Sequence, residues 1–119
     1  MTPLLVVLGA MAGAPLRLLA ERLAASRRGA GSVAGTLAVN VAGSGVFGFL
    51  LGLTEAPGWV LALVGTGFCG TLTTFSTFGA DVVRLRGQGR TGTAAAYLAG
   101  TLLLGIGAAA AAYGLAGLL

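Results

Sequence analysis

The residues best suited to chemistry lie in one segment, residues 67–79, which reads GFCGTLTTFSTFG. It combines five hydroxyl side chains with three glycines, whereas the sequence around it is apolar. Each glycine costs a helix about 1 kcal/mol relative to alanine. Irregular backbone at membrane depth is tolerated only where protein buries it or where it lines a watery cavity. We therefore expect this segment to hold a functional site at an interruption of a membrane-spanning helix.

Two further segments carry hydrogen-bond donors at helical spacing. Their polar residues follow one another at intervals of four, so each row shares one face of a helix. The rows are Thr36, Asn40 and Ser44 in the first segment, and Thr93, Tyr97 and Thr101 in the second. Phe75 and Phe78 are three residues apart and share a face in the same way.

These side chains suit an anion. Hydroxyls, the Asn amide and the Tyr phenol all donate hydrogen bonds, and the edges of aromatic rings are positive. At 1.5 Å per residue, Asn40, Phe75 and Tyr97 fall at similar depths, whereas Phe78 is expected near the end of its helix. Asn, Ser and Thr also commonly bridge packed membrane helices, so a purely structural role stays open.

Acidic and metal-binding side chains are nearly absent. The chain has three Asp and Glu residues, no His and one Cys. An intrachain disulfide is therefore excluded, and a metal site built from side chains or a catalytic nucleophile with its base is not expected. No carboxylate lies in the middle of an apolar stretch, which argues against a cation pathway. We predict no enzymatic activity and interpret the donors as the lining of an anion pore.

Four apolar segments are available to position these residues. The chain is 56% hydrophobic and 8% charged, whereas soluble domains carry about 25% charged residues. About 20 helical residues cross a bilayer, and the first segment, which lacks a basic start, is expected to be a retained span rather than a signal peptide. We predict an all-α membrane protein forming a single domain over residues 1–119, with helices over 3–24, 33–53, 58–80 and 93–115.

The charges are distributed unevenly between the two ends of these helices. With four spans, the termini and the loop 54–57 share one side, and six arginines share the other: Arg22, Arg27, Arg28, Arg84, Arg86 and Arg90. Arginine-rich loops stay in the cytoplasm, where they face an anionic leaflet. We expect a plasma-membrane protein with both termini outside and no nucleic-acid partner. Arg17 is expected to pair with Glu21 one turn later.

Small residues recur at intervals that allow helices to approach closely. The pairs are Gly9/Gly13, Ser44/Gly48 and Gly48/Gly52. They predict tight helix packing and do not indicate a function.

The segment 67–78 resembles the signature of the Fluc/CrcB fluoride channels, GFCGGxTTFSTF, which marks a broken third helix in that family. Residues 13–17 resemble the family's Gly-Ala-x-x-Arg, and Asn40 falls in its Val-Asn pair. The chain length and the four spans also agree, so the resemblance covers essentially the whole chain.

The resemblance implies an antiparallel dimer with two narrow fluoride pores and a third helix broken near the membrane centre. It implies that Phe75 and Phe78 line the pore, and that Asn40 donates to the anion or positions a phenylalanine. Other positions match the family's polar track, namely Thr36, Tyr97 and Thr101. It further implies a structural sodium ion at the dimer interface, held by backbone carbonyls that match Gly70 and Thr73.

Three positions depart from the family pattern. Thr71 stands where a second glycine is usual, and Asp81 replaces a usual Glu, which shortens its reach toward the polar track. Gly105 takes a position where a hydroxyl is common. The last two changes weaken the expectation that the polar track of this subunit is complete.

The expected function is passive export of cytoplasmic fluoride. Because the arginine bias predicts a single orientation, we expect one half of an antiparallel heterodimer with a homologous subunit; the alternative is that the bias is overridden and the dimer is homomeric. A second alternative is a non-conducting partner subunit. A small four-span multidrug exporter fits poorly, because it requires a buried carboxylate and only Glu21 is available on the first helix.

Overall fold

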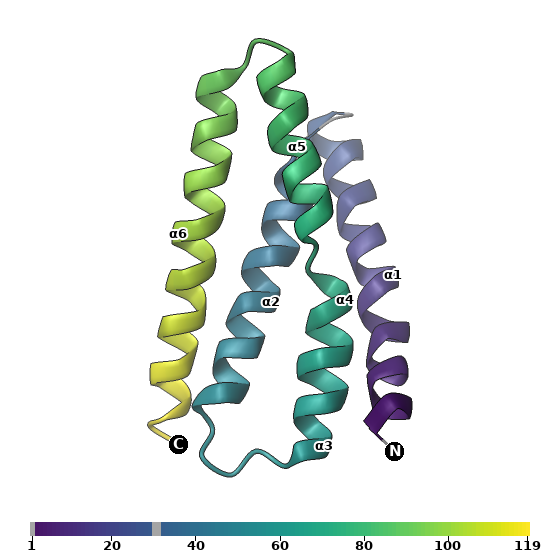
Figure 1. Ribbon diagram of the computed structural model, residues 1–119, viewed down its shortest axis with the longest axis vertical. Helices are drawn as coiled ribbons and strands as arrows, with labels where there is room; N and C mark the ends of the chain where they lie inside the picture. The colour runs from purple at the N-terminus through teal and green to yellow at the C-terminus, as the bar shows by residue number, and fades with distance from the viewer. Residues whose placement is uncertain (1, 30–31) are drawn as a thin grey trace.

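The computed structural model describes residues 2–29 and 32–119, which form helices joined by short loops (Figure 1). In chain order the elements are α1 (Thr2–Arg28), α2 (Ala34–Gly52), α3 (Gly58–Val60), the π-helix η1 (Leu61–Cys69), α4 (Gly70–Leu72), α5 (Phe75–Gly87) and α6 (Thr91–Ala116). Elements α3, η1, α4 and α5 follow one another as a single column (Figure 1).

Four stretches are long and apolar enough to cross a membrane. They are Thr2–Arg28, Ala34–Gly52, Gly58–Gly87 and Thr91–Ala116. The expected all-α fold with four spans is confirmed, and the chain is a multi-pass membrane protein.

Two helices run further than the hydropathy pattern predicts. α1 continues to Arg28 rather than ending at residue 24, and α5 continues to Gly87 rather than ending at residue 80. Arginines occupy the last turn of both helices, where a cation is favourable because it faces the negative end of the helix dipole. Gly29 follows α1 with φ +96°, a conformation that glycine adopts without a Cβ penalty. Phe78 therefore lies inside α5 rather than near its end.

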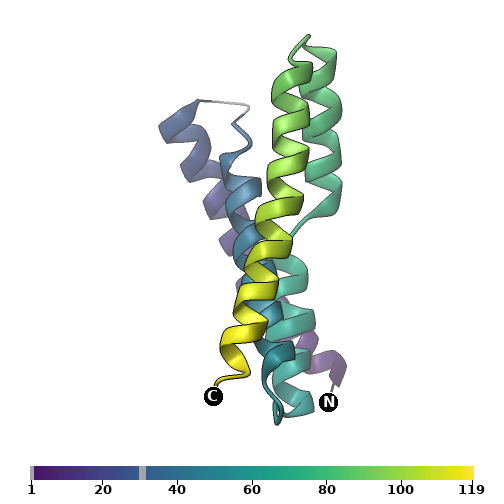
Figure 2. The ribbon, with the colours of Figure 1, turned by 90° about the vertical axis from the view of Figure 1, so that its left-hand side faces the viewer.

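Both chain ends and the loop after α2 lie at one end of the molecule, and the arginine-bearing ends of α1 and α5 lie at the other (Figure 1). In a view turned by 90° the arginine end opens, because α1 diverges there from the α5–α6 pair (Figure 2). The molecule measures 48 × 29 × 22 Å along its principal axes.

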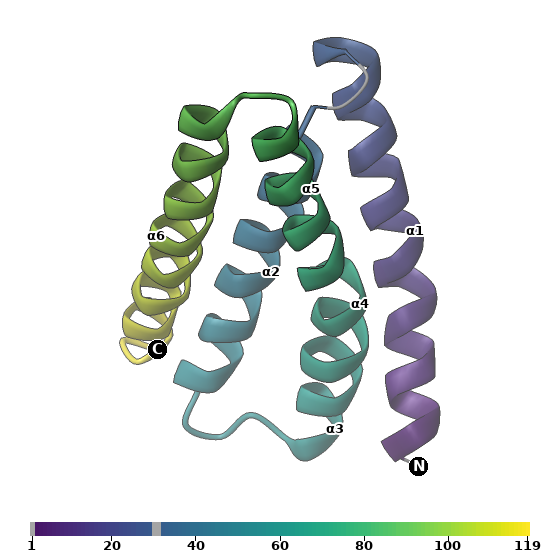
Figure 3. The ribbon, with the colours of Figure 1, turned by 45° about the horizontal axis from the view of Figure 1, so that its top comes forward.

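Glycines bring the helices into close contact. A Cβ at Gly48 would lie 2.7 Å from Ala109 Cα, and one at Gly67 would lie 2.5 Å from the Val6 carbonyl oxygen. Both distances are shorter than Cβ contacts allow, so α6 packs on α2, and α1 packs on the η1–α4 column, only because these positions lack side chains (Figure 3). The packing expected from the small-residue pairs is confirmed.

The expected ion pair between Arg17 and Glu21 is not formed. The one ion pair among the described residues joins Arg84 to Asp81, whereas Glu21 Oε1 is buried without a hydrogen-bond partner. The one-turn spacing along α1 is therefore not sufficient to bring the two groups together.

The third column changes geometry twice along its length. In η1 the hydrogen bonds span five residues, as in the bond from the Gly70 N–H to the Gly65 carbonyl. α4 then ends at Leu72, and the backbone of Thr73 (ψ 155°) and Thr74 (φ −148°, ψ 120°) is extended before α5 begins. We refer to residues 73–74 as the linker.

Candidate functional site

Asn40 of α2 holds the linker in place. Its Oδ1 accepts a hydrogen bond from the Thr74 backbone N–H at 2.8 Å, and its Nδ2 donates to the Thr74 carbonyl at 3.2 Å. These two hydrogen bonds fix the orientation of the Asn40 amide, because a flipped amide would place its NH₂ group against the Thr74 N–H and its oxygen against the Thr74 carbonyl. Asn40 thus replaces, for one residue, the backbone partners that a continuous helix would supply.

Thr74 starts the next helix. Its hydroxyl oxygen accepts from the Thr77 N–H at 3.2 Å and donates to the Thr77 hydroxyl at 3.0 Å. This is the arrangement of a helix N-cap. The sequence pattern did not single out Thr74, although a Thr directly before a helical segment is a recognisable cap signal.

The other hydroxyls of this segment turn back on their own helix. Thr71 Oγ1 donates to the Gly67 carbonyl at 2.8 Å, and Thr73 Oγ1 donates to the Cys69 carbonyl at 2.8 Å. A Thr side chain in a membrane helix commonly satisfies itself in this way. The hydroxyl protons of Thr71 and Thr73 are therefore already donated to backbone carbonyls one turn earlier.

Two carbonyls lose their helical partners at the linker. In a continuous helix the Gly70 carbonyl would accept from the Thr74 N–H, and the Thr73 carbonyl would accept from the Thr77 N–H. Both N–H groups are diverted, the first to Asn40 Oδ1 and the second to Thr74 Oγ1. The two carbonyls that the family resemblance associates with sodium are thus among those that lose their helical partners at the linker.

A groove of about 380 Å³ lies beside the linker. It is walled by the linker and by residues of α2, α5 and α6: Asn40, Ser44, Thr73, Thr74, Phe75, Phe78, Thr101, Leu102, Gly105, Ile106 and Ala109. Four of the six residues predicted to line an anion pore meet here, namely Asn40, Phe75, Phe78 and Thr101. The other two, Thr36 and Tyr97, lie outside this groove.

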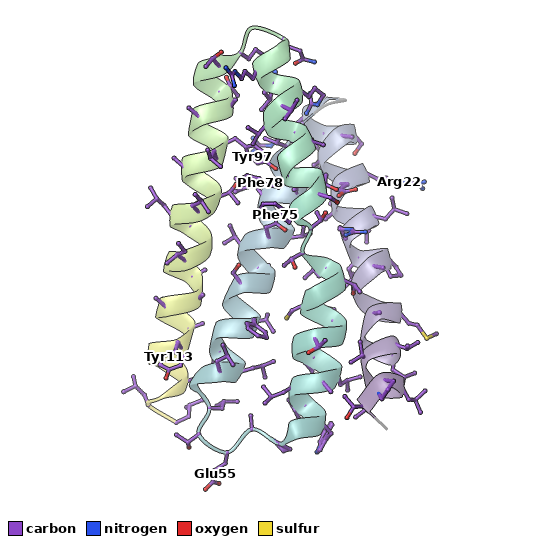
Figure 4. The ribbon with its side chains drawn as sticks, in the orientation of Figure 1. Arg22, Glu55, Phe75, Phe78, Tyr97 and Tyr113 are labelled. Atoms are coloured by element: carbon purple, nitrogen blue, oxygen red, sulfur yellow. The ribbon has the colours of Figure 1, made fainter. Side chains whose placement is uncertain are left out.

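The aromatic rings form a short series that leads away from the groove. Phe75 and Phe78 have ring centroids 6.1 Å apart, and Phe78 and Tyr97 are 5.1 Å apart in an edge-to-face arrangement. Figure 4 shows the three rings following one another toward the arginine end. Phe78 is 6% exposed, whereas Phe75 is 84% exposed, so the chain buries one ring and presents the other on its surface.

Tyr97 connects the ring series to a charged pair. Its hydroxyl donates to Asp81 Oδ2 at 3.2 Å, and Asp81 Oδ1 lies 3.4 Å from Arg84 Nη2. Thr36, which is 3% exposed, lies within reach of the same hydroxyl. Asp81 thus reaches Tyr97 of the polar row although its side chain is shorter than the usual Glu. α5 continues as a helix past residue 80, which places Asp81 one turn beyond Phe78 and opposite Tyr97.

Thr101 differs from the hydroxyls described above. Its Oγ1 is buried and makes no hydrogen bond within the described part of the chain. A buried polar atom without a partner costs about 1–3 kcal/mol. Because Thr101 lines the groove, its unsatisfied hydroxyl is a candidate ligand-binding group.

The architecture and the signature segment agree with a family match. The family model described as CrcB-like protein, Camphor Resistance (CrcB), matches residues 4–115. The chain belongs to the CrcB family.

Curated relatives of this CrcB chain carry a functional name. The Fluoride-specific ion channel FluC 1 of Nocardia farcinica is 46% identical over 111 residues, covering 93% of this chain and 78% of the relative. The protein of the same name from Frankia casuarinae is 44% identical over 115 residues, covering 90% of this chain and 89% of the relative. The Fluoride-specific ion channel FluC of Bordetella avium is 46% identical over 109 residues, covering 85% and 84%.

The matches confirm the resemblance seen in the sequence. They place the chain in a family of ion channels rather than enzymes. The expectation that the chain is not an enzyme is confirmed on this ground.

Proposed function

We propose that this CrcB chain is a passive, fluoride-selective channel subunit that exports cytoplasmic fluoride. The observation that carries the proposal is the groove in which Asn40, Phe75, Phe78 and the unpartnered Thr101 hydroxyl converge. Its relatives named as fluoride-specific ion channels supply the identity of the anion.

The groove offers a dehydrated anion several weak, fixed partners. The second N–H of the Asn40 amide and the Thr101 hydroxyl are donors, and ring edges attract negative charge. A narrow pore that replaces hydration with fixed donors selects by size and field strength. Fluoride is the smallest halide, so it approaches such donors more closely than chloride does.

The direction of transport follows from acid–base chemistry and the membrane potential. Hydrogen fluoride crosses membranes as a neutral acid and ionises in the less acidic cytoplasm. A potential that is negative inside favours exit of the anion by about 2.3 kcal/mol per 100 mV. The channel therefore requires no coupled ion and no nucleotide.

Exposure of Phe75 supports a pore completed by a second subunit. A large aromatic ring that is 84% exposed, beside a groove partly lined by Asn40 and Thr101, is suited to a protein neighbour or a pore lumen. We propose an antiparallel dimer with two pores, in which the linker at residues 73–74 is the break of the third span and lies near the membrane centre. Phe75 and Phe78 would line the pore, with Asn40 positioning them through the linker.

The six arginines at one end support a heterodimer. A chain with this bias is expected to insert in one orientation, in the plasma membrane, with its arginine end in the cytoplasm and both termini outside. An antiparallel partner must then be a homologous subunit of opposite bias. A homodimer would require the charge bias to be overridden.

A structural sodium ion fits the released carbonyls of Gly70 and Thr73. Sodium is a hard cation that prefers oxygen ligands, and this segment offers backbone oxygens in place of carboxylates. Gly70 is exposed with no neighbour within 4 Å of a Cβ built on it, which leaves space for the same carbonyls of a partner subunit. The ion would supply charge that holds the two linkers together.

The test is fluoride efflux from liposomes, read with a fluoride electrode against a chloride control. Fast, fluoride-selective efflux from the chain alone would support the channel and contradict an obligate heterodimer. Efflux that requires an oppositely biased CrcB homologue would support the heterodimer. The absence of efflux in both arrangements would contradict the proposed function.

The second candidate function is a non-conducting partner subunit. It is favoured by Gly105, which leaves an apolar stretch of α6 along the groove. In a conducting pair, replacing Phe75 and Phe78 by Ala in this chain alone distinguishes the two. Reduced efflux supports a working pore, and unchanged efflux supports the silent partner.

A further inference from the structure

Ser44 is the second uncommitted hydroxyl of the groove. Of the hydroxyl residues in the groove wall, Thr73 donates to the Cys69 carbonyl, and Thr74 is engaged with Thr77. Ser44 makes no hydrogen bond within the described residues, just as Thr101 makes none. The groove-wall hydroxyls that are not committed to another described group are therefore those of Thr101 on α6 and Ser44 on α2.

The position of Ser44 complements a gap on the opposite helix. Ser44 follows Asn40 by one turn of α2, on the same face. Across the groove stands Gly105, and a Cβ built there would lie 3.5 Å from Ser44 Oγ. The next groove residues of α6, Ile106 and Ala109, are apolar. Ser44 therefore provides a hydroxyl where α6 provides no side chain.

Ser44 also lies where two grooves meet. A second groove of about 370 Å³ is walled by Gly43, Ser44, Phe47, Gly65, Thr66, Cys69, Gly70 and Thr73. Ser44 and Thr73 belong to both walls, and the Thr73 hydroxyl is already bonded to its own helix. An anion that moves along α2 past the linker would thus meet the Ser44 hydroxyl.

We propose that Ser44 is an anion-binding residue of the conduction path, and that its hydroxyl performs on α2 the role that Gly105 leaves unfilled on α6. The proposal rests on the proposed channel function. It implies that the polar path of this subunit is complete, with its donors divided between α2 and α6. It therefore disfavours the non-conducting alternative.

The experiment compares fluoride efflux of the parent, Ser44→Ala and the double variant Ser44→Ala/Gly105→Ser, in whichever assembly conducts. Loss of a hydrogen bond to a charged species is expected to reduce efflux by about tenfold. Gly105→Ser returns a hydroxyl from the other side of the same space, so the double variant is expected to recover most of the efflux. Ser26→Ala is the matched control, because the Ser26 hydroxyl is exposed on α1 and donates to the Leu23 carbonyl.

Each outcome decides the point. Efflux of Ser44→Ala equal to that of the parent would overturn the proposal while leaving the channel function standing. Reduced efflux without recovery in the double variant, combined with a lowered melting temperature, would assign Ser44 to packing and overturn it as well. No efflux from the parent would instead contradict the proposed function, on which this inference depends.

Discussion

At the scale of single residues, Asn40 has the most consequential contacts. One side-chain amide satisfies both backbone groups of Thr74 and thereby diverts the N–H that would otherwise bond to Gly70. Helix backbone is rarely interrupted without such compensation. In the proposed channel Asn40 would have a structural and a functional role at once, because the linker that it holds leads directly into Phe75.

Replacing Asn40 tests this double role. Asn40→Ala leaves the two Thr74 backbone groups unpaired, at about 1–3 kcal/mol each, so we expect a lower melting temperature in detergent and a loss of fluoride efflux. Asn40→Asp retains an acceptor for the Thr74 N–H but adds a negative charge to the groove, so we expect a greater loss of efflux.

The control for both variants is Gln88→Ala, which removes an exposed amide beyond α5. Gln88→Ala should change neither the melting temperature nor the fluoride efflux. A parent-like melting temperature for Asn40→Ala would contradict the structural part of the argument.

At the scale of elements, glycines determine which helices meet. α2 and α6 approach so closely at Gly48 that a Cβ there would overlap the backbone of Ala109. The groove beside the linker depends on this contact, because α6 contributes Thr101 and Gly105 to its wall. The closeness of the two helices therefore sets the width of the groove.

The pair Gly48→Ala and Gly107→Ala separates packing from helix propensity. Alanine stabilises a helix by about 1 kcal/mol relative to glycine, and Gly107 has no neighbour within 4 Å of its Cβ position. We therefore expect Gly107→Ala to raise the melting temperature or leave it unchanged, and Gly48→Ala to lower it by forcing α2 and α6 apart. Equal effects of the two substitutions would contradict the close contact.

At the scale of the whole molecule, the end that carries the arginines is also the end at which the helices diverge (Figure 2). Arg22 lies toward the end where the helices diverge, and Glu55 lies at the opposite end (Figure 4). The last turns of α1 and α5 carry further arginines at the diverging end. Such a distribution orients a membrane protein. For the proposed antiparallel dimer, a single orientation would require a partner subunit of opposite orientation.

A cysteine-accessibility experiment measures the orientation directly. We expect a membrane-impermeant thiol reagent to label Glu55→Cys in intact cells, and to label Gln88→Cys only after permeabilisation. The parent chain is the control, because Cys69 is 3% exposed. Equal labelling of both variants in intact cells would show dual insertion and remove the argument for a heterodimer.

Hydropathy and spacing were sufficient for much of the fold. The four spans follow from uncharged stretches whose length matches a bilayer, and the tight packing follows from glycines at intervals of four. The ends of α1 and α5 were misjudged, because hydropathy ends where the arginines begin, whereas the helical backbone continues and its dipole favours those arginines.

The sequence by itself determined which faces carry donors, because helical periodicity sorts residues onto faces without knowledge of neighbours. It could not determine which faces meet, since that depends on the rotation and depth of each helix. Only the tertiary structure decided that Asn40 pairs with Thr74, that Asp81 reaches Tyr97, and that Ser44 lies opposite Gly105. Contacts between helices distant in sequence depend on how closely their backbones approach each other, and the glycines at the helix interfaces determine that distance.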